Sequence, residues 1–217
     1  MTNSIITVAT MKGGSGKSTL ASCLAVHWLL NGRRPTIIDA DPQRSIARLA
    51  AREKALGGVP VVEDATELAW TARRLAETRG PIIIDTPGFR SDATLACIAA
   101  TDFLLVPVKA SPLDVDRMVD TLNTLINGVS GWRPVFRCVL TQTTRESVIA
   151  RHIRDELIEA GFPVLKAEMP NRVSYGEAAL WGATPSLTQR TGAAARDIAA
   201  IADEIDSIIA IKQPAVA

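Results

Sequence analysis

The chain has 217 residues, of which 47% are hydrophobic and 22% are charged, as in an ordinary globular protein with a substantial core. This length fits one α/β domain better than two very small ones. The formal net charge of +1 excludes a strongly basic nucleic-acid binder, so any binding to DNA must come from a local patch. No apolar run reaches the roughly 18 residues that a membrane span needs, and the N-terminus lacks the apolar core of a signal peptide.

The most informative stretch is a glycine-rich segment that follows the first apolar run. Residues 5–9 (IITVA) suit a buried strand, residues 11–19 read MKGGSGKST, and residues 20–30 have the composition of a helix. Strand, glycine-rich turn and helix in this order are typical of a phosphate-binding loop, because glycines let backbone N–H groups face a polyphosphate. In such a loop Lys17 contacts the β- and γ-phosphates and the hydroxyl of Ser18 binds Mg²⁺.

Two later strands end in carboxylates. Residues 35–39 form a strand that continues into Asp39-Ala40-Asp41-Pro42, and residues 80–88 hold a buried strand that ends at Asp85. Open parallel sheets bind their ligands at this carboxyl edge. An aspartate at the end of a strand, beside a phosphate loop, is the arrangement that holds Mg²⁺ through its water shell. A polar turn that merely closes a strand explains one of the first two aspartates well, and both less well.

Hydrophobic periodicity and turn residues predict further alternating elements along the chain. The expected helices cover residues 45–56, 66–77, 92–99, 111–129, 146–160 and 191–211, and the expected strands cover 59–62, 103–108, 134–141 and 164–165. Such alternation predicts a parallel sheet covered by helices on both faces, a three-layer α/β/α fold. We expect residues 1–212 to form a single domain and residues 213–217 to form a disordered tail.

The three cysteines lie apart in apolar segments and have no C-x-x-C spacing. An odd, scattered set predicts buried, reduced thiols in a cytosolic protein. They are Cys23, Cys97 and Cys138.

The phosphate loop departs from the strict pattern at two positions. Met11 stands where the first glycine belongs, and Lys12 precedes the glycine pair. This form resembles the deviant Walker A loop of the ParA/MinD ATPases. Residues 39–43 and 85–88 resemble that family's other two nucleotide-site elements, and residues 169–185 resemble its adenine-side segment. The resemblance covers nearly the whole chain in matching order and implies a P-loop NTPase fold with a mostly parallel, twisted sheet.

The resemblance implies ATP or ADP with Mg²⁺ as the cofactors and ATP hydrolysis as the activity. In this family the early lysine reaches the partner's phosphates within an ATP-dependent homodimer, and the second carboxylate orients the attacking water. The candidate catalytic residues are therefore Lys12, Lys17 and Asp41, and the candidate metal-site residues are Ser18, Asp39 and Asp85. The candidate nucleotide contacts are Lys12, Gly13, Gly14, Ser15, Gly16, Lys17, Ser18 and Thr19, with Gln142, Pro170 and Arg172 further along the chain.

The function implied is that of a small ParA, a cytoplasmic, nucleoid-associated ATPase that partitions or positions a cargo. The chain starts at the phosphate-loop strand, so we expect no N-terminal operator-binding region. The ATP dimer is expected to bind DNA without sequence preference, and a ParB-like or adaptor partner to stimulate slow basal hydrolysis. Candidate DNA contacts are Arg172, Arg190 and Arg196, for which simple surface solubility is an equally reasonable explanation.

Three alternatives share this loop or fold. A MinD-like ATPase that cycles on a membrane needs a basic amphipathic C-terminal helix, whereas the last helix here carries Asp197, Asp203, Glu204 and Asp206. An electron-transfer protein like the nitrogenase iron protein needs two cysteines placed to bridge a cluster, and these cysteines suit core packing better. A metabolic ligase such as dethiobiotin synthetase does not need the second lysine of the loop.

Overall fold

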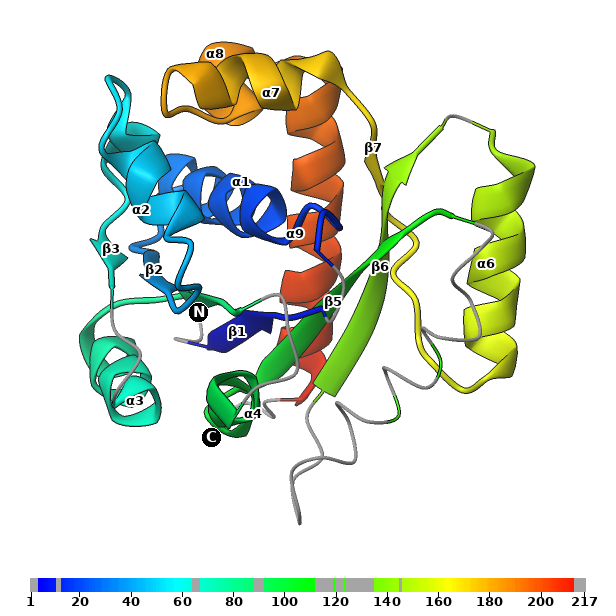
Figure 1. The fold of residues 1–217 in the computed structure, drawn as a ribbon, viewed down its shortest axis with the longest axis horizontal. Coiled ribbons are helices and arrows are strands. Elements are labelled where there is room, and N and C mark those ends of the chain that lie inside the picture. Colours follow the sequence, from blue (N-terminus) through cyan, green and yellow to red (C-terminus); the bar gives the residue numbers. More distant parts are fainter. Residues whose placement is uncertain are drawn as a thin grey trace.

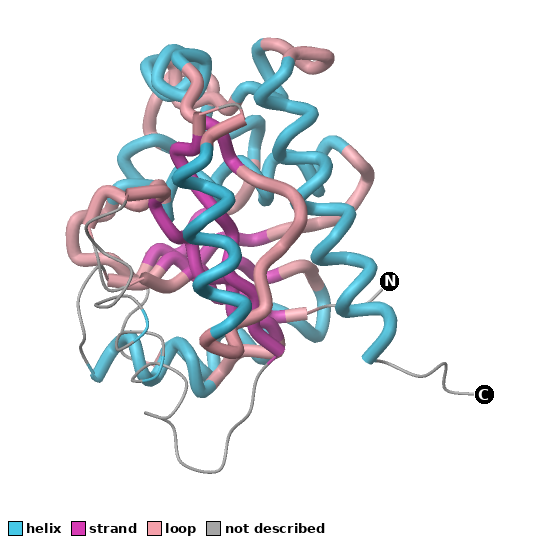
Figure 2. The backbone as a smooth tube through the Cα atoms, turned by 90° about the vertical axis from the view of Figure 1, so that its right-hand side faces the viewer, coloured by secondary structure: helices cyan, strands magenta, loops and turns pink. Residues whose placement is uncertain are grey.

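The computed structural model describes residues 4–10, 13–63, 67–87, 92–111, 119, 123, 135–144 and 146–212. They form a sheet between two layers of helices (Figures 1 and 2). The strands are β1 (Ile5–Val8), β2 (Thr36–Asp39), β3 (Val61–Val62), β4 (Ile82–Asp85), β5 (Phe103–Lys109), β6 (Val135–Thr143) and β7 (Met169–Pro170). The helices are α1 (Lys17–Leu30), α2 (Ser45–Ala50), α3 (Leu68–Thr78), α4 (Asp92–Ala99), α6 (Val148–Glu159), α7 (Val173–Leu180), α8 (Pro185–Thr188) and α9 (Ala193–Lys212), with one 3₁₀-helix, η1 (Ala55–Gly58).

The seven strands lie in the order β3-β2-β4-β1-β5-β6-β7, and neighbouring strands run parallel. The sheet starts at its centre with β1, and the chain then builds first one side and afterwards the other (Figure 1). The predicted three-layer fold with a parallel sheet is therefore confirmed. None of the helices in the described ranges is long and apolar enough to cross a membrane.

The strands are apolar on both faces because helices cover both. Along β1, Ile6 and Val8 are buried in a cluster with α1 and α9, whereas Ile5 is buried in a cluster with α3 and α4. In β4, likewise, Ile83 is buried in the first of these clusters, whereas Ile82 and Ile84 are buried in the second. Successive side chains of a strand point to opposite faces, so a strand buried on both sides needs no polar positions until it ends.

Most predicted boundaries agree with the structure. The exceptions are the helix expected over 45–56 and the strand expected at 164–165. The helices expected over 66–77, 146–160 and 191–211 are α3, α6 and α9, each shifted by at most two residues at either end. The helix expected over 45–56 ends at Ala50 as α2, and the chain continues into η1. Ala55 has φ 41° and Leu56 has φ 50°, so left-handed residues replace the last predicted turn. Most of the helix expected over 111–129 lies outside the described residues.

The strand expected at 164–165 is only an isolated bridge between Val164 and Cys138, and the strand beside β6 is β7. The reason is the hydrogen bonding of the next residues. The N–H groups of Lys166 and Ala167 donate to the carboxylate of Glu204 on α9, at 2.9 and 3.0 Å. The backbone therefore turns to the terminal helix before it pairs again with β6.

The terminal helix α9 packs its apolar face into the protein. Ile198, Ile201 and Ile205 are fully buried in the cluster that contains α1. Its acidic residues also face inward partners: Asp206 accepts hydrogen bonds from Trp28 Nε1 at 3.0 Å and from Arg33 Nη1 at 2.6 Å. The apolar stripe of α9 is thus part of the core.

A second junction ties the α2–η1 segment to the end of α7. The N–H groups of Lys54 and Leu56 donate to the carbonyls of Trp181 and Gly182, both at 2.8 Å. At Gly182, where φ is +68°, a Cβ atom would lie 2.5 Å from the carbonyl oxygen of Leu49. Glycine is therefore required for this close approach.

The three cysteines are buried in three different apolar clusters of the fold. Among the described residues no group of three or more His, Cys, Asp or Glu side chains is placed to hold a metal ion. Burial raises the pKa of each thiol from 9.0 to about 12. The fraction present as reactive thiolate is therefore very small at neutral pH.

We expect the native protein to react slowly with a thiol reagent at pH 8, and to expose three reactive thiols in denaturant. At pH 9 an exposed thiol would be about half ionised, whereas a thiol with a pKa of about 12 would be only about 0.1% thiolate, so the native protein should still react slowly. The measurement is absorbance after addition of an aromatic disulfide. One fast equivalent in the native state would contradict this burial.

Candidate functional site

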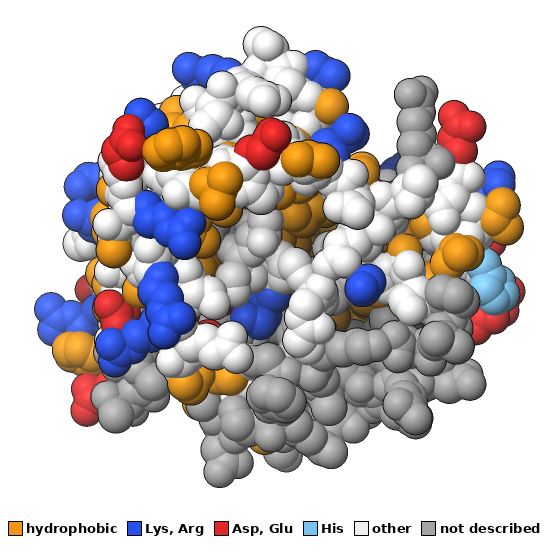
Figure 3. Space-filling view, turned by 45° about the horizontal axis from the view of Figure 1, so that its top comes forward, with side chains coloured by type: hydrophobic (Ala, Val, Ile, Leu, Met, Phe, Trp, Pro, Cys, Tyr) orange, Lys and Arg blue, Asp and Glu red, His pale blue; other side chains and the backbone are white. Residues whose placement is uncertain are grey.

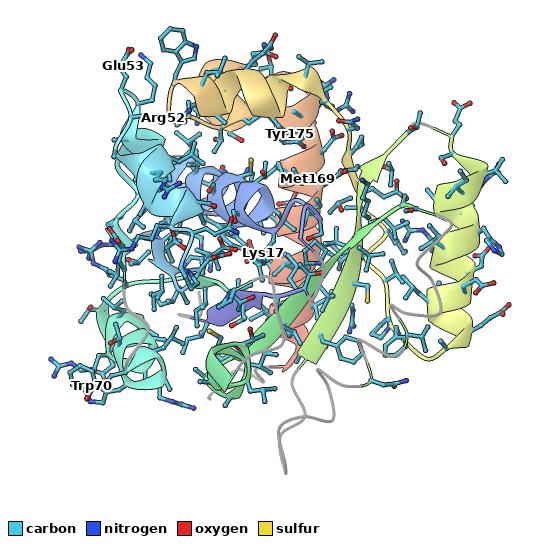
Figure 4. The ribbon with its side chains drawn as sticks, in the orientation of Figure 1. Lys17, Arg52, Glu53, Trp70, Met169 and Tyr175 are labelled. Atoms are coloured by element: carbon cyan, nitrogen blue, oxygen red, sulfur yellow. The ribbon has the colours of Figure 1, made fainter. Side chains whose placement is uncertain are left out.

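The site is built at the carboxyl edge of the central strands. In the registered sheet, Val8 at the end of β1 pairs with Asp85 at the end of β4, and Asp85 pairs with Asp39 at the end of β2. The glycine-rich turn after β1 and the predicted carboxylates therefore meet at one edge. Figure 4 labels Lys17 there, at the start of α1.

The described part of the turn, residues 13–16, has the shape of a cradle. Gly14 has φ +76° and Gly16 has φ +84°, which are left-handed values that favour glycine. A Cβ atom at either position would meet nothing within 4 Å, so there is open space beside both glycines. The hydroxyl of Ser15 is buried and has no hydrogen-bond partner in the described structure. An open cradle with an orphaned buried hydroxyl fits a bound polyphosphate.

Lys17 is the first residue of α1, and its buried ammonium lies between two carboxylates. Nζ is 2.9 Å from Asp85 Oδ1 and 3.5 Å from Asp41 Oδ2. Ser18 Oγ donates to Asp85 Oδ2 at 2.6 Å. Burial raises the pKa of Asp85 to about 6, while the charge of Lys17 and the hydrogen bond from Ser18 oppose that rise. The predicted lysine, hydroxyl and strand-end carboxylate are therefore in direct contact.

The two aspartates after β2 differ in what they contact. Asp39 Oδ2 accepts hydrogen bonds from the N–H groups of Ile46 and Ala47 at 3.0 and 2.9 Å, and so caps the N-terminus of α2. Asp41 Oδ1 accepts from Gln43 N at 2.9 Å, which leaves Oδ2 facing Lys17. Asp41 is thus the carboxylate that faces the lysine. Sequence reasoning missed the capping by Asp39 because the helix begins six residues later.

A cavity of about 440 Å³ adjoins the turn on the β6 side. It brings together Gly16 and Thr19 of the loop region with the predicted residues Gln142, Pro170 and Arg172. The other lining residues are Thr141, Met169, Asn171, Val173, Tyr175 and Gly176. Figure 4 shows Met169 and Tyr175 above Lys17 in that view. Met169 and Tyr175 belong to the segment that resembles the family's adenine side, whereas the sequence offered no specific signal for Thr141, because a threonine in a strand is an ordinary residue.

The three arginines proposed for DNA contacts differ in their surroundings. Arg172 is paired with Asp197, with its Nε 2.5 Å from Oδ2. Arg190 is exposed and donates to the carbonyl of Leu30 at 3.4 Å. Arg196 is exposed and donates to the carbonyl of Thr191. Lys and Arg side chains are spread over the left and upper parts of the face in Figure 3.

Lys12 and Met11 lie outside the described residues, so the position of the early lysine is not part of the site described above.

A glycine cradle after the first strand, a lysine and a serine at the helix start, and strand-end carboxylates define a nucleotide-binding protein of the P-loop class. Comparison with known families agrees. Residues 6–185 match the family of the CobQ/CobB/MinD/ParA nucleotide binding domain, and the chain belongs to this family.

Curated relatives of similar length lie within this family. The chain is 30% identical to "Maintenance of carboxysome distribution protein A" of Gloeobacter kilaueensis, over 93% of this chain and 94% of the relative. The protein of the same name from Halothiobacillus neapolitanus is 28% identical, with 94% of each chain covered. The chromosome-partitioning ATPase Soj of Thermus thermophilus is 26% identical, over 92% of this chain and 94% of Soj.

Solved structures agree in fold. Apo McdA of Cyanothece superposes with a TM-score of 0.76 at 18% identity, covering 93% of this chain and 99% of McdA. MinD of Pyrococcus horikoshii, complexed with Mg-ADP, gives a TM-score of 0.76 at 18% identity, covering 98% of this chain and 99% of MinD. The described sheet and helices are therefore those of the ParA/MinD P-loop fold.

Proposed function

We propose that the chain is a Mg²⁺-dependent ATP hydrolase that acts as a switch for partition or positioning of a cargo. The observation that carries this proposal is the placement of Lys17, buried at the base of an open glycine cradle and held by Asp85 and Asp41. An ammonium in that position can exchange its carboxylate partners for phosphate oxygens. We further propose that residues 1–212 act as one ATPase domain, since one sheet draws strands from residue 5 to residue 170.

The roles of the site residues follow from their contacts. The N–H groups of the loop and Lys17 would hold the β- and γ-phosphates, and Ser18 with Asp85 would hold Mg²⁺, which neutralises charge on the phosphates when bound. Asp39 would act indirectly, by fixing the turn that carries Asp41. Asp41 would orient the attacking water. Phosphoryl transfer of this kind needs positioning and charge more than covalent chemistry.

Slow basal hydrolysis is expected from the placement of the two histidines. His27 lies in the last turn of α1, and His152 lies on α6, 3.4 Å from Glu156. Both lie away from the loop, so neither serves as a base for water. We propose that Lys12 of a second copy and a ParB-like or adaptor partner complete the site, in an ATP-dependent homodimer.

The cargo part of the proposal rests on the relatives. Proteins named for carboxysome distribution and for chromosome partitioning both match more than nine tenths of this chain. The shared element of these names is the placement of a large cellular object, and we propose that role here. Gel filtration with ADP and with a slowly hydrolysed ATP analogue tests the switch. A monomer in both states would overturn it.

The packing of α9 speaks against this helix as a membrane-binding element. A membrane-cycling relative needs a free amphipathic helix at the C-terminus, whereas the apolar stripe of α9 is buried against α1. Ile211 is exposed, at the very end of the helix.

We expect the ATP-bound dimer to retain DNA and the ADP-bound protein to release it. Arg190→Ala should reduce the slope of log affinity against log salt by about 1.8 per dimer, since each phosphate contact contributes about 0.9. Arg151→Ala, at an exposed position of α6, is the matched control and should leave the slope unchanged. Filter retention across a salt series measures both. Equal retention with ATP and ADP would contradict DNA cycling.

A further inference from the structure

Two adjacent side chains at the end of β6 hold the outer side of the glycine cradle. Thr141 Oγ1 donates to the carbonyl oxygen of Ser15 at 2.8 Å. Gln142 Nε2 donates to the carbonyl oxygen of Gly14 at 2.5 Å. Consecutive carbonyls of the cradle are therefore each bound by consecutive residues of one strand.

Such an arrangement is unusual, because neighbouring side chains of a strand point to opposite faces of the sheet. It is possible here because Gln142 has φ +53°, a left-handed value that is uncommon for a residue other than glycine. The pairing of β6 with β7 also shifts its register between Thr141 and Thr143. The left-handed residue breaks the alternation, so both side chains face the cradle. Backbone outliers of this kind concentrate at functional sites.

The two hydrogen bonds determine which way the cradle's peptide groups face. In a planar trans peptide, the C=O and the N–H of the same unit point in opposite directions. With the carbonyls of Gly14 and Ser15 bound by β6, the N–H groups of Ser15 and Gly16 point away from β6. These are donors of the kind that a phosphate-binding loop presents to its ligand.

We propose that Gln142 is a positioning residue, which sets the phosphate cradle in its binding conformation before the ligand arrives. The proposal rests on the proposed function as an ATPase. It is more specific than the role expected from the sequence, which was a nucleotide contact without a stated part of the ligand. In this role Gln142 acts on the phosphates through Gly14 and contributes nothing to the choice of base.

Ligands with and without a base separate these roles. Calorimetry would measure the affinity of Mg²⁺-pyrophosphate, ATP and GTP for the wild-type chain and for Gln142→Leu, which keeps the side-chain size and removes the donor. We expect pyrophosphate and ATP to bind about three- to tenfold more weakly, by the same factor, as the loss of one hydrogen bond gives. The ratio of ATP to GTP affinity should stay at its wild-type value.

Two further variants control the test. Gln142→Gly removes the donor and relieves the left-handed backbone, and should show the same loss of pyrophosphate affinity. Gln189→Leu makes the same chemical change at an exposed position after α8 and should bind as the wild type does. Wild-type pyrophosphate affinity in either Gln142 variant, or a changed ATP to GTP ratio in Gln142→Leu, would overturn the positioning role alone. A wild-type chain that bound neither ATP nor pyrophosphate would overturn the proposed function, and this role with it.

Discussion

Lys17→Ala is expected to abolish ATP binding. The ammonium is the one cation that the described residues place between the strand-end carboxylates, at 2.9 Å from Asp85 and 3.5 Å from Asp41. Two charge-assisted hydrogen bonds to phosphate oxygens contribute about 1.5–3 kcal/mol each, so affinity should fall by about 10²- to 10⁴-fold. Calorimetric titration with ATP in the presence of Mg²⁺ measures this loss.

The same substitution leaves the buried carboxylate of Asp85 without its cation. Breaking a buried ion pair by removing one partner destabilises a fold by about 3–5 kcal/mol, so the melting temperature should also fall. Binding is therefore measured well below that temperature. Lys54→Ala is the control, because Lys54 is an exposed lysine beside Glu53. Wild-type ATP affinity in the Lys17 variant would remove the assignment of the cradle to phosphate.

Asp41→Ala is expected to bind ATP, to accumulate as a dimer, and to hydrolyse ATP about 10²-fold more slowly or worse. The fold should survive, because the helix that follows is capped by Asp39 and not by Asp41. Steady-state phosphate release and gel filtration with ATP measure the two effects. Hydrolysis at the wild-type rate would exclude Asp41 as the residue that orients water.

Asp39→Ala is the comparison variant for Asp41→Ala. It removes the carboxylate that caps α2 and fixes the turn carrying Asp41, so about 1 kcal/mol of stability should be lost and hydrolysis should fall less than in Asp41→Ala. Lys12→Ala should differ from Asp41→Ala in assembly: both variants should bind ATP, but Lys12→Ala should dimerise poorly. We therefore expect Asp39 to affect mainly stability, and Asp41 to affect mainly turnover.

The sequence predicted most of the strands along the chain and the aspartates that end two of them, because a buried parallel strand is a short apolar run and a terminal carboxylate interrupts that run. The same pattern is sufficient to place Lys17, Ser18 and Asp85 together at one edge of the sheet. The residues around the cavity were harder to predict. Gln142, Pro170 and Arg172 were named and do line it, whereas the hydrogen bond of Gln142 to the cradle depends on one left-handed dihedral angle.

The errors have a common physical origin, which is competition from contacts distant in sequence. Residues 164–165 have strand character, but the chain beyond them bonds to Glu204. Residues 51–56 have helical character, but Lys54 and Leu56 bond to the end of α7. Neither partner lies within the window over which periodicity is read.

The inward-facing acids of α9 also change what the charge of this helix means. Asp197 accepts a hydrogen bond from Arg172, and Glu204 accepts from two backbone N–H groups. Asp206 accepts from Trp28 and Arg33. By charge count alone, α9 should repel an anionic surface. Because much of its negative charge is bonded to donors within the protein, its outward electric field is weaker than its composition suggests. Neutralising one of these three acids should therefore be detected first as an easier unfolding of the chain, and only secondarily as a changed attraction between the molecule and any polyanion.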